Sequence, residues 1–274
     1  MEASLELASD RLTQQNMPIA LAEMLEHHGD VLQIEMPYGD PVVVRRVLDE
    51  CFAPCDVLVA ADEILVPHLL VSDMDSTIIG QECIDELAEY AGIKPEIAAI
   101  TDRTMRGELD FSAALHERVA LLAGVDEEAI SDCLLHRIKL SPGAKPMVEA
   151  LKARGCRTVL VTGGFHHFAD VIGRELGFDR VVANRLAIAD GRLTGQLVGS
   201  ISDATTKVSV LKEERERLGA DAVTMALGDG ANDAQMLAEA TYGVAYHAKP
   251  AAEAVANGSM KRGDLSSVLR LLDL

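Results

Sequence analysis

The sequence predicts an α/β fold built on a mainly parallel sheet, with a set of helices inserted after the first core strand. Three apolar runs of strand length each end in polar residues or glycines. Residues 69–73 end in an aspartate, residues 158–164 in a threonine and two glycines, and residues 224–230 in an aspartate between two glycines. Helical segments separate these runs, and strands that alternate with helices along a chain form mainly parallel sheets. Ligands bind at the carboxyl ends of strands in such sheets. The three polar strand ends therefore predict a single ligand site.

The first run ends in Asp73, and a second carboxylate follows at Asp75. Side chains alternate faces along an extended chain, so we expect both carboxylates to point the same way, with their Cα atoms roughly 7 Å apart. Two carboxylates held together repel each other unless a cation is bound between them. One of them could then attack a phosphorus centre while the other moves a proton. The alternative is a strand end whose Asx or Ser/Thr turn caps the next helix.

Residues 1–65 carry mixed signals and predict a short N-terminal α/β appendage of unknown role, before a core that spans residues 66–274. The elements expected there are a helix near 18–27, a strand over 31–36, a turn at 39–41, a helix over 42–52 and a strand over 56–59. Catalytic residue types do not concentrate in this stretch. We therefore assign no site to it.

The segment that follows the second core strand predicts a helix and then a hairpin. A helix is expected over residues 165–176, directly after the strand at 158–164. Segments 183–186 and 195–198 flank the turn residues Asp190 and Gly191, which predicts a β-hairpin.

A long helical segment at residues 80–140 separates the first two core strands, and we expect it to form a cap over the site. Gly92 and Pro95 mark the end of one helix and the start of the next. Asp110 is expected to cap a further helix, on which Arg118 interrupts an apolar stripe. Arg118 could snorkel at the edge of that stripe or hold a substrate carboxylate.

Composition limits the partners of the chain. Its 274 residues suit one large domain or two smaller ones, and its formal net charge of -19 disfavours nucleic acid and anionic membranes as partners. The first residues lack a signal-peptide pattern, and no stretch of 18 apolar residues is present. The five scattered cysteines predict reduced thiols. We expect a cytoplasmic protein.

These motifs together resemble those of the haloacid dehalogenase-like (HAD) phosphatases, over roughly residues 66–274. The matching positions are 73–77, 82–87, 103–119, 162–165, Lys207, 228–233 and 247–250. A pair of aspartates alone is weak evidence, but several motifs in the same order, with a helical insert between the first two, are specific. The resemblance implies a Rossmann-like core whose cap follows the first core strand.

The resemblance implies a two-step phosphoryl transfer that uses Mg²⁺. Asp73 would be the nucleophile that forms an aspartyl-phosphate, and Asp75 would serve first as acid and then as base. Mg²⁺ would be held by the carboxylates of Asp73 and Asp229 and by the backbone carbonyl of Asp75. Lys207 would neutralise charge on the phosphoryl group. By pattern alone, Lys207 is instead a surface lysine at the start of a helix.

The resemblance also assigns the phosphate contacts. Thr162 and the backbone N–H of Gly163 would bind phosphate oxygens, because a glycine lets the backbone approach an anion closely. Asn232 would reach the phosphate or its waters. Asp233 would support the metal ligands from behind.

The implied substrate is O-phosphoserine, bound by residues of the cap. Glu82 would pair with the substrate ammonium and Arg118 with its carboxylate, while Met105 and Phe111 would form apolar walls. By periodicity alone, Glu82 belongs with Glu86 and Glu89 to a solvated helix face. Arg118 has independent support from its place on the apolar stripe.

The resemblance thus implies a phosphatase that releases serine from this small molecule, the last step of serine biosynthesis, as a monomer or homodimer. Two alternative activities stay open: transfer of the phosphoryl group to an alcohol such as homoserine, and hydrolysis of another small phosphometabolite. A sensor without catalysis is disfavoured, because it has no need of the acid and base Asp75.

Overall fold

The computed structural model describes residues 1–25, 28–105 and 108–274, which form two compact units. The first unit comprises Met1–Val71, Pro142–Arg157 and Leu211–Leu274. The second unit comprises Ser72–Ser141 and Thr158–Val210.

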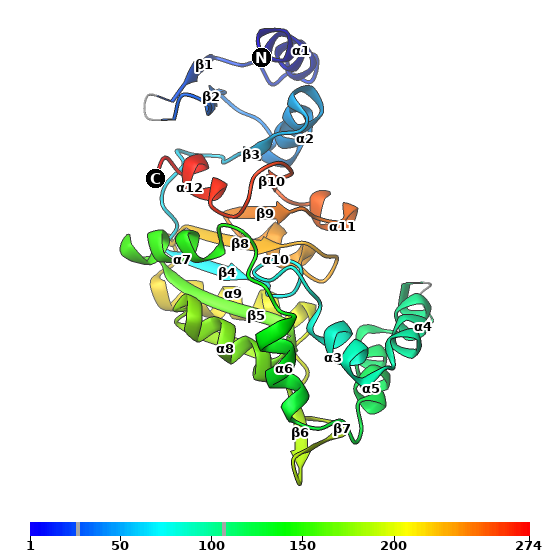
Figure 1. Ribbon diagram of the computed structural model, residues 1–274. Coiled ribbons are helices and arrows are strands. Elements are labelled where there is room, and N and C mark those ends of the chain that lie inside the picture. The colour runs from blue at the N-terminus through cyan, green and yellow to red at the C-terminus, as the bar shows by residue number, and fades with distance from the viewer. Residues whose placement is uncertain (26–27, 106–107) are drawn as a thin grey trace. The chain divides into compact units, whose positions relative to one another are not determined.

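The first unit is built on a mainly parallel sheet (Figure 1). In order across the sheet, its strands are β3 (Asp56–Leu58), β10 (Gly258–Met260), β9 (Tyr242–Tyr246), β8 (Thr224–Gly228) and β4 (Leu69–Ser72), the last of which enters the unit up to Val71. β9 runs parallel to both of its neighbours, and β3 is antiparallel to β10 at the edge. Every residue of β4, β8 and β9 is buried, as expected for parallel strands covered on both faces.

Short helices accompany these strands. They are α7 (Ala144–Ala153), α10 (Ala234–Glu239), α11 (Pro250–Glu253) and α12 (Ser267–Leu271). The longer helix α9 (Ala204–Leu218) begins in the second unit and continues into the first at Leu211.

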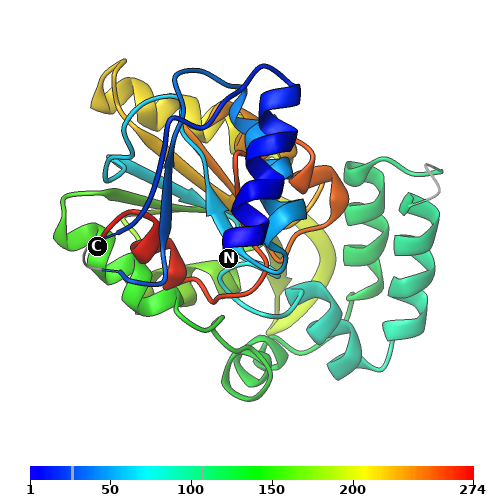
Figure 2. The same cartoon turned by 90° about the horizontal axis from the view of Figure 1, so that it is seen from above.

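The N-terminal region of the first unit packs two helices against each other. Figure 2 shows α1 (Glu2–Gln14), in dark blue, alongside α2 (Pro41–Phe52). Leu12, Val44 and Val47 are buried in the small apolar core between them. α2 begins at Pro41, one residue before the start that the sequence predicted. The Asp40 side chain accepts the N–H groups of Val42 and Val43, and Pro41 occupies the first helical position.

The helix expected near residues 18–27 is wrong. The described part of that stretch contains the strand β1 (Leu21–Met24), paired antiparallel with β2 (Leu32–Glu35); residues 26 and 27 lie outside the described residues. Leu, Ala, Glu and Met all favour helices, but the ladder that joins Leu21 to Glu35 and Met24 to Leu32 outweighs this weak preference.

The second unit contains the helical insert, which is confirmed. Its helices are α3 (Cys83–Ala91), α4 (Lys94–Met105), α5 (Phe111–Leu121) and α6 (Glu128–His136), and Figure 2 shows α4 and α5 side by side. Gly92 ends α3 in the left-handed conformation, with φ of 74°. Asp110 caps α5 by accepting the N–H of Ala113 at 2.7 Å.

The same unit holds β5 (Arg157–Phe165), which enters it at Thr158, together with β6 (Arg180–Ala189), β7 (Arg192–Val198) and α8 (His166–Leu176). β5 and β6 are parallel, and β6 and β7 form the predicted hairpin, visible as a long arm in Figure 1. Asp190 and Gly191 at its tip both have positive φ, which such a tight turn requires. In the part of the chain that the structure describes, no helix combines the length and apolarity needed to span a membrane.

Candidate active site

Asp73 and Asp75 both lie beyond the end of the first core strand, because β4 stops at Ser72. Asp75 instead belongs to a turn, in which Ser76 has a φ of 55°. The strand alternation from which we expected the two carboxylates to align therefore does not extend to Asp75. Both are buried, and each has different partners.

Asp73 forms a buried ion pair with Lys207. The lysine Nζ lies 2.7 Å from the Asp73 Oδ1, and the two side chains are 1% and 4% exposed. The same Asp73 oxygen accepts the N–H of Met74 at 2.8 Å. A buried ammonium requires such a partner, because removing its hydration is costly. The alternative that made Lys207 a surface lysine is wrong.

The start of α9 places Lys207. Asp203 precedes the helix and accepts the N–H of Thr206 through its side chain at 3.0 Å. Its backbone carbonyl accepts the N–H of Lys207 at 3.2 Å. Lys207 thus belongs to a capped first helical turn. The cap fixes the backbone from which the lysine side chain extends to Asp73.

Asp75 is held in a different environment. Its carboxylate accepts the thiol of Cys83 at 3.2 Å and the Cys83 N–H at 3.4 Å. Burial raises the pKa of Asp75 to about 7, and the charge of Glu82 adds to the rise, whereas Cys83 and Lys207 oppose it. A carboxyl group with a pKa near neutrality can both hold a proton and release it, as a general acid and base must.

Glu82 differs from the other acids of its helix. It immediately precedes α3 and accepts the hydroxyl of Ser76 at 2.8 Å. Glu86 and Glu89, in contrast, both pair with Arg137. The solvated helix face that periodicity suggested therefore accounts for Glu86 and Glu89, which the structure pairs with Arg137, while Glu82 faces the turn that contains Asp75.

Arg118 lies half-buried on α5, and its Nε donates to the carbonyl of Ala114 at 3.4 Å. Burial lowers the pKa of Arg118, whereas the negative charges of Asp85, Glu82 and Asp75 act to raise it. Leu115, on the same helix face, is almost fully buried. The guanidinium therefore stands at the border between an apolar face and a group of carboxylates.

The cap also contacts β5 at Gly163. A Cβ atom added to Gly163 would lie 3.1 Å from the ring of Phe111, so this ring closes over the glycine. Met105 is the last residue of α4, but its side chain lies outside the described part of the structure.

The turn at Thr162 and Gly163 is a bulge in β5. Val161 pairs with Val182 of β6 and Phe165 with Asn184, so the three residues from Thr162 to Gly164 oppose a single residue of β6. Within this bulge the Thr162 hydroxyl accepts the N–H of Gly164 at 2.9 Å, which leaves the hydroxyl proton to be donated. Bulges of this kind re-aim backbone groups next to functional sites.

In the first unit, β8 leads directly into Asp229, which is buried. The fully buried Asp233 accepts the N–H groups of Asp229 at 3.2 Å and of Gly230 at 3.0 Å. A Cβ on Gly228 would approach the Asp233 carboxyl carbon to 2.4 Å, so only glycine fits there. The Asn232 side chain lies against Gly230: a Cβ added to Gly230 would be 2.3 Å from the Oδ1 of Asn232.

Lys249 is a contact of Asp229 to which the sequence attached no role. Its Nζ lies 3.2 Å from Oδ2 of Asp229, and its N–H donates to the Asp229 carbonyl at 2.8 Å. The stretch 247–250 was recognisable as a motif, but one exposed lysine in it carries no pattern that points to a particular carboxylate.

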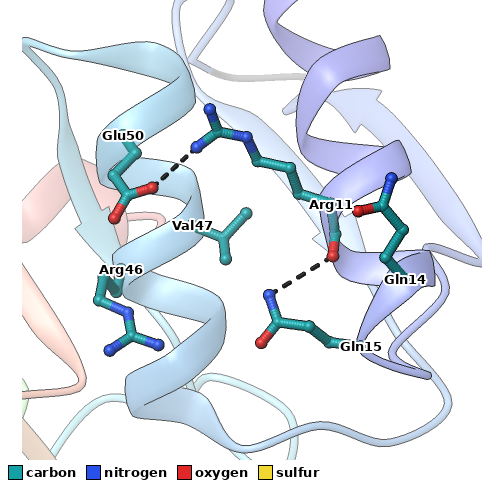
Figure 3. Close-up of a pocket in the computed structure, with 6 residues that line it drawn as sticks. All are labelled: Arg11, Gln14, Gln15, Arg46, Val47 and Glu50. Carbon is teal, nitrogen blue, oxygen red and sulfur yellow. Dashed lines mark hydrogen bonds and ion pairs between the residues drawn. The ribbon is translucent and has the colours of Figure 1, made fainter.

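The pocket of about 280 Å³ in Figure 3 lies away from these residues in the chain. Its walls come from α1, its C-terminal cap and α2. Arg11 reaches across it to Glu50 at 2.7 Å, and both side chains are largely exposed. An open surface depression with this ion pair provides neither a nucleophile nor a buried acid.

Comparisons with known proteins agree with this geometry. A family model described as haloacid dehalogenase-like hydrolase matches residues 70–238. A phosphoserine phosphatase of Idiomarina loihiensis is 44% identical over 206 residues, which cover 74% of this chain and 93% of that protein. Another, from Archaeoglobus fulgidus, is 42% identical over 208 residues, or 76% of this chain, but only 60% of that longer protein is matched.

Among solved structures, a probable phosphoserine phosphatase from Vibrio cholerae in unliganded form has a TM-score of 0.74 and 34% identity. The match covers 99% of this chain and 83% of that one.

Proposed function

Because the chain belongs to the haloacid dehalogenase-like hydrolase family, we propose that it hydrolyses O-phospho-L-serine to L-serine and phosphate. The buried ion pair of Asp73 and Lys207, near an acid whose pKa is about 7, is the observation that carries this proposal. A carboxylate nucleophile and a group that can donate and then accept a proton are the two parts that such a reaction requires.

In the first step, an Asp73 carboxylate oxygen attacks the phosphorus atom and the bond from phosphorus to the serine oxygen breaks. Asp75, which its raised pKa leaves protonated in a substantial fraction of molecules at neutral pH, gives its proton to the departing serine oxygen. Lys207 offsets negative charge on the phosphoryl group and holds Asp73 in position.

In the second step, water attacks the phosphorus atom of the aspartyl-phosphate. Asp75, now ionised, takes a proton from this water, and the bond from phosphorus to the Asp73 oxygen breaks. Phosphate leaves, and both carboxyl groups return to their starting state. One residue thus serves both steps, because its pKa lies close to neutral pH.

The phosphate oxygens are assigned to Thr162, the N–H of Gly163 and Asn232. The bulge in β5 supports the first two, because it takes these residues out of the regular ladder and leaves the Thr162 hydroxyl proton available for donation. Asp233 acts indirectly, by fixing the backbone around Asp229.

A divalent cation, which we propose is Mg²⁺, would be held by the carboxylates of Asp73 and Asp229 and the carbonyl of Asp75. These donors fit, since they are all oxygen atoms and both carboxylates are buried. The strands that lead into Asp73 and Asp229 are neighbours in the sheet: β4 and β8 begin together where His68 donates to the carbonyl of Val223. When bound, the cation supplies positive charge for the phosphoryl oxygens.

Substrate choice is assigned to the cap. Arg118 would bind the carboxylate of phosphoserine, supported by its half-buried place facing acidic groups. Glu82 would bind the ammonium, supported by its position at the turn that contains Asp75. Phe111 closes over Gly163 as one apolar wall, and Met105 is the proposed second wall.

We also propose that the chain divides into an N-terminal region at residues 1–65 and a core at residues 66–274, with the cap at residues 80–140. We further propose a cytoplasmic location and a monomeric or homodimeric state.

Phosphate release from a panel of phosphometabolites, with Mg²⁺ and then with EDTA, tests the activity. We expect O-phosphoserine to be preferred over phosphothreonine and sugar phosphates, and EDTA to remove turnover. Equal rates on glucose phosphate would contradict the role of the cap. Added homoserine tests the alternative acceptor: formation of phosphohomoserine faster than phosphate release would make the chain a phosphotransferase.

Replacing Arg118 tests substrate recognition. Arg118→Ala should raise KM for O-phosphoserine by about 10- to 100-fold through loss of a charged hydrogen-bonded partner, and leave KM for phosphoethanolamine, which has no carboxylate, nearly unchanged. Arg137→Ala is the matched control, since this arginine of the cap pairs with Glu86 and Glu89. An equal loss on both esters would show that Arg118 only supports the cap.

A further inference from the structure

Asn184 of β6 is a buried amide whose side-chain hydrogen bonds, within the described part of the structure, all join backbone atoms. Its side chain is among the least exposed polar groups of the second unit, at 2%. Its Nδ2 donates to the carbonyls of Gly163 at 2.8 Å and of Ser202 at 3.2 Å. Its Oδ1 accepts the N–H of Ser202 at 2.8 Å. One amide therefore joins two segments that are distant in the sequence.

The first segment is the bulge of β5. The ladder between β5 and β6 is interrupted after Val161 and resumes where Phe165 pairs with Asn184. A carbonyl inside such a bulge is displaced from the ladder and needs another donor if it is buried. Asn184 supplies that donor to Gly163, at the first position where the ladder resumes.

The second segment is the entry to α9. Ser202 is held on both its N–H and its carbonyl by Asn184, which fixes the peptide groups on either side of it. The next residue, Asp203, caps the helix, and Lys207 follows in its first turn. Ser202 also lies beside the bulge, since a Cβ on Gly163 would be 3.8 Å from its carbonyl oxygen.

We propose that Asn184 is a positioning residue that fixes the phosphate-binding turn at Thr162 and Gly163 and the start of the Lys207 helix in one common geometry. The inference rests on the proposed function, because it concerns the phosphate contacts of that site. An amide is needed, since it offers two donors and an acceptor on a short planar group; an aspartate lacks the donors, and an aliphatic residue lacks both.

The chain provides a matched control in Asn257 of the first unit. Its Nδ2 donates to the carbonyls of Val59 at 2.9 Å and Thr241 at 2.8 Å, and its Oδ1 accepts the N–H of Gly243 at 2.7 Å. The bonding pattern equals that of Asn184, but the bridged segments carry no residue assigned to the site.

The experiment compares Asn184→Ala with Asn257→Ala in the full chain with Mg²⁺. Both should lower Tm. Asn184→Ala should also lower kcat/KM for O-phosphoserine by about 10²-fold, as expected for a displacement of reacting groups of about 1 Å, whereas Asn257→Ala should stay within about 2-fold of the parent. The inhibition constant of inorganic phosphate should rise about 10-fold in Asn184→Ala alone, as the binding turn and Lys207 separate.

A lower Tm with unchanged kcat/KM and unchanged phosphate inhibition in Asn184→Ala would overturn the inference, since the residue would then be structural only. If that variant does not fold, the pair Asn184→Asp and Asn257→Asp replaces it, because Asp keeps the side-chain shape and the bond from Ser202 N–H. The Tm shift caused by inorganic phosphate needs no turnover. It distinguishes loss of the positioned turn from failure of the proposed function, in which the parent chain itself would release no phosphate from O-phosphoserine.

Discussion

Asp49 in the first unit and Asp75 in the second are both buried carboxylates, but their surroundings differ in charge. Asp49 pairs with Arg45, lies 3.2 Å from the Nζ of Lys261 and accepts the hydroxyl of Ser259 at 2.7 Å. The Asp75 carboxylate accepts hydrogen bonds from the thiol and the N–H of Cys83, and the negative charge of Glu82 acts on it.

The difference separates a structural carboxylate from a functional one. The two cations near Asp49 neutralise it, and Arg45 also donates to the Glu253 carbonyl at 2.6 Å, so the group ties α2 to α11 and β10. Around Asp75, burial and Glu82 disfavour the ionised state. A buried carboxylate that is paired with cations stays ionised and stabilises one conformation. A buried carboxylate with few compensating cations has a raised pKa and is able to exchange a proton near pH 7.

The largest effect that this contrast predicts is on turnover. Asp73→Asn should lower kcat by about 10⁴-fold or more, because the nucleophile is removed, while circular dichroism shows a folded protein. Asp49→Asn, an equivalent change in a buried ion pair, should leave kcat of the folded fraction within about 2-fold. A similar loss of kcat in both variants would mean that the cluster around Asp49 also serves the site.

The next effect is on stability. Arg45→Ala should lower the free energy of unfolding by about 3–5 kcal/mol in urea denaturation, because it leaves Asp49 with fewer partners in a buried place. Arg11→Ala, which breaks the exposed pair with Glu50, should cost about 0–1 kcal/mol. Equal losses would show that burial does not distinguish the two pairs.

The remaining effect concerns pH. The pKa of Asp75 is raised from its ordinary 3.8 to about 7, so the folded state holds a proton that the unfolded state releases between these values. The stability that this proton contributes is present in full below pH 4 and is lost as pH rises through 7. The urea midpoint of the metal-free protein should therefore fall with rising pH more steeply than that of Asp75→Asn. Parallel curves for the two proteins would refute the raised pKa.

The sequence predicted those features that depend on local pattern. The three strand ends, the hairpin at Asp190 and the cap at Asp110 each need only a run of neighbouring residues, and the structure contains them. The position of Lys207 was predictable only through the family motif, since its burial depends on Asp73, which is distant in the chain.

The parts that were missed depend on pairing between distant residues or on weak preferences. β1 was predicted as a helix because its residues favour helices, and its pairing with β2 decides otherwise. Cys83 and Asn184 have no spacing that marks them, since one acts through a thiol on Asp75 and the other through backbone groups of two separate segments. Asp75 was placed on a strand that ends at Ser72.

The bond between Ser259 and Asp49 has a consequence for synthesis of the chain, because its partners are 210 positions apart. β3 also finds its neighbour β10 only in this late segment. At ribosomal rates, the N-terminal helices would wait about 10–40 s for these partners to be made. During that interval the charges of Arg45 and Asp49 remain in water, and their burial is postponed until Ser259 and its neighbours have been translated.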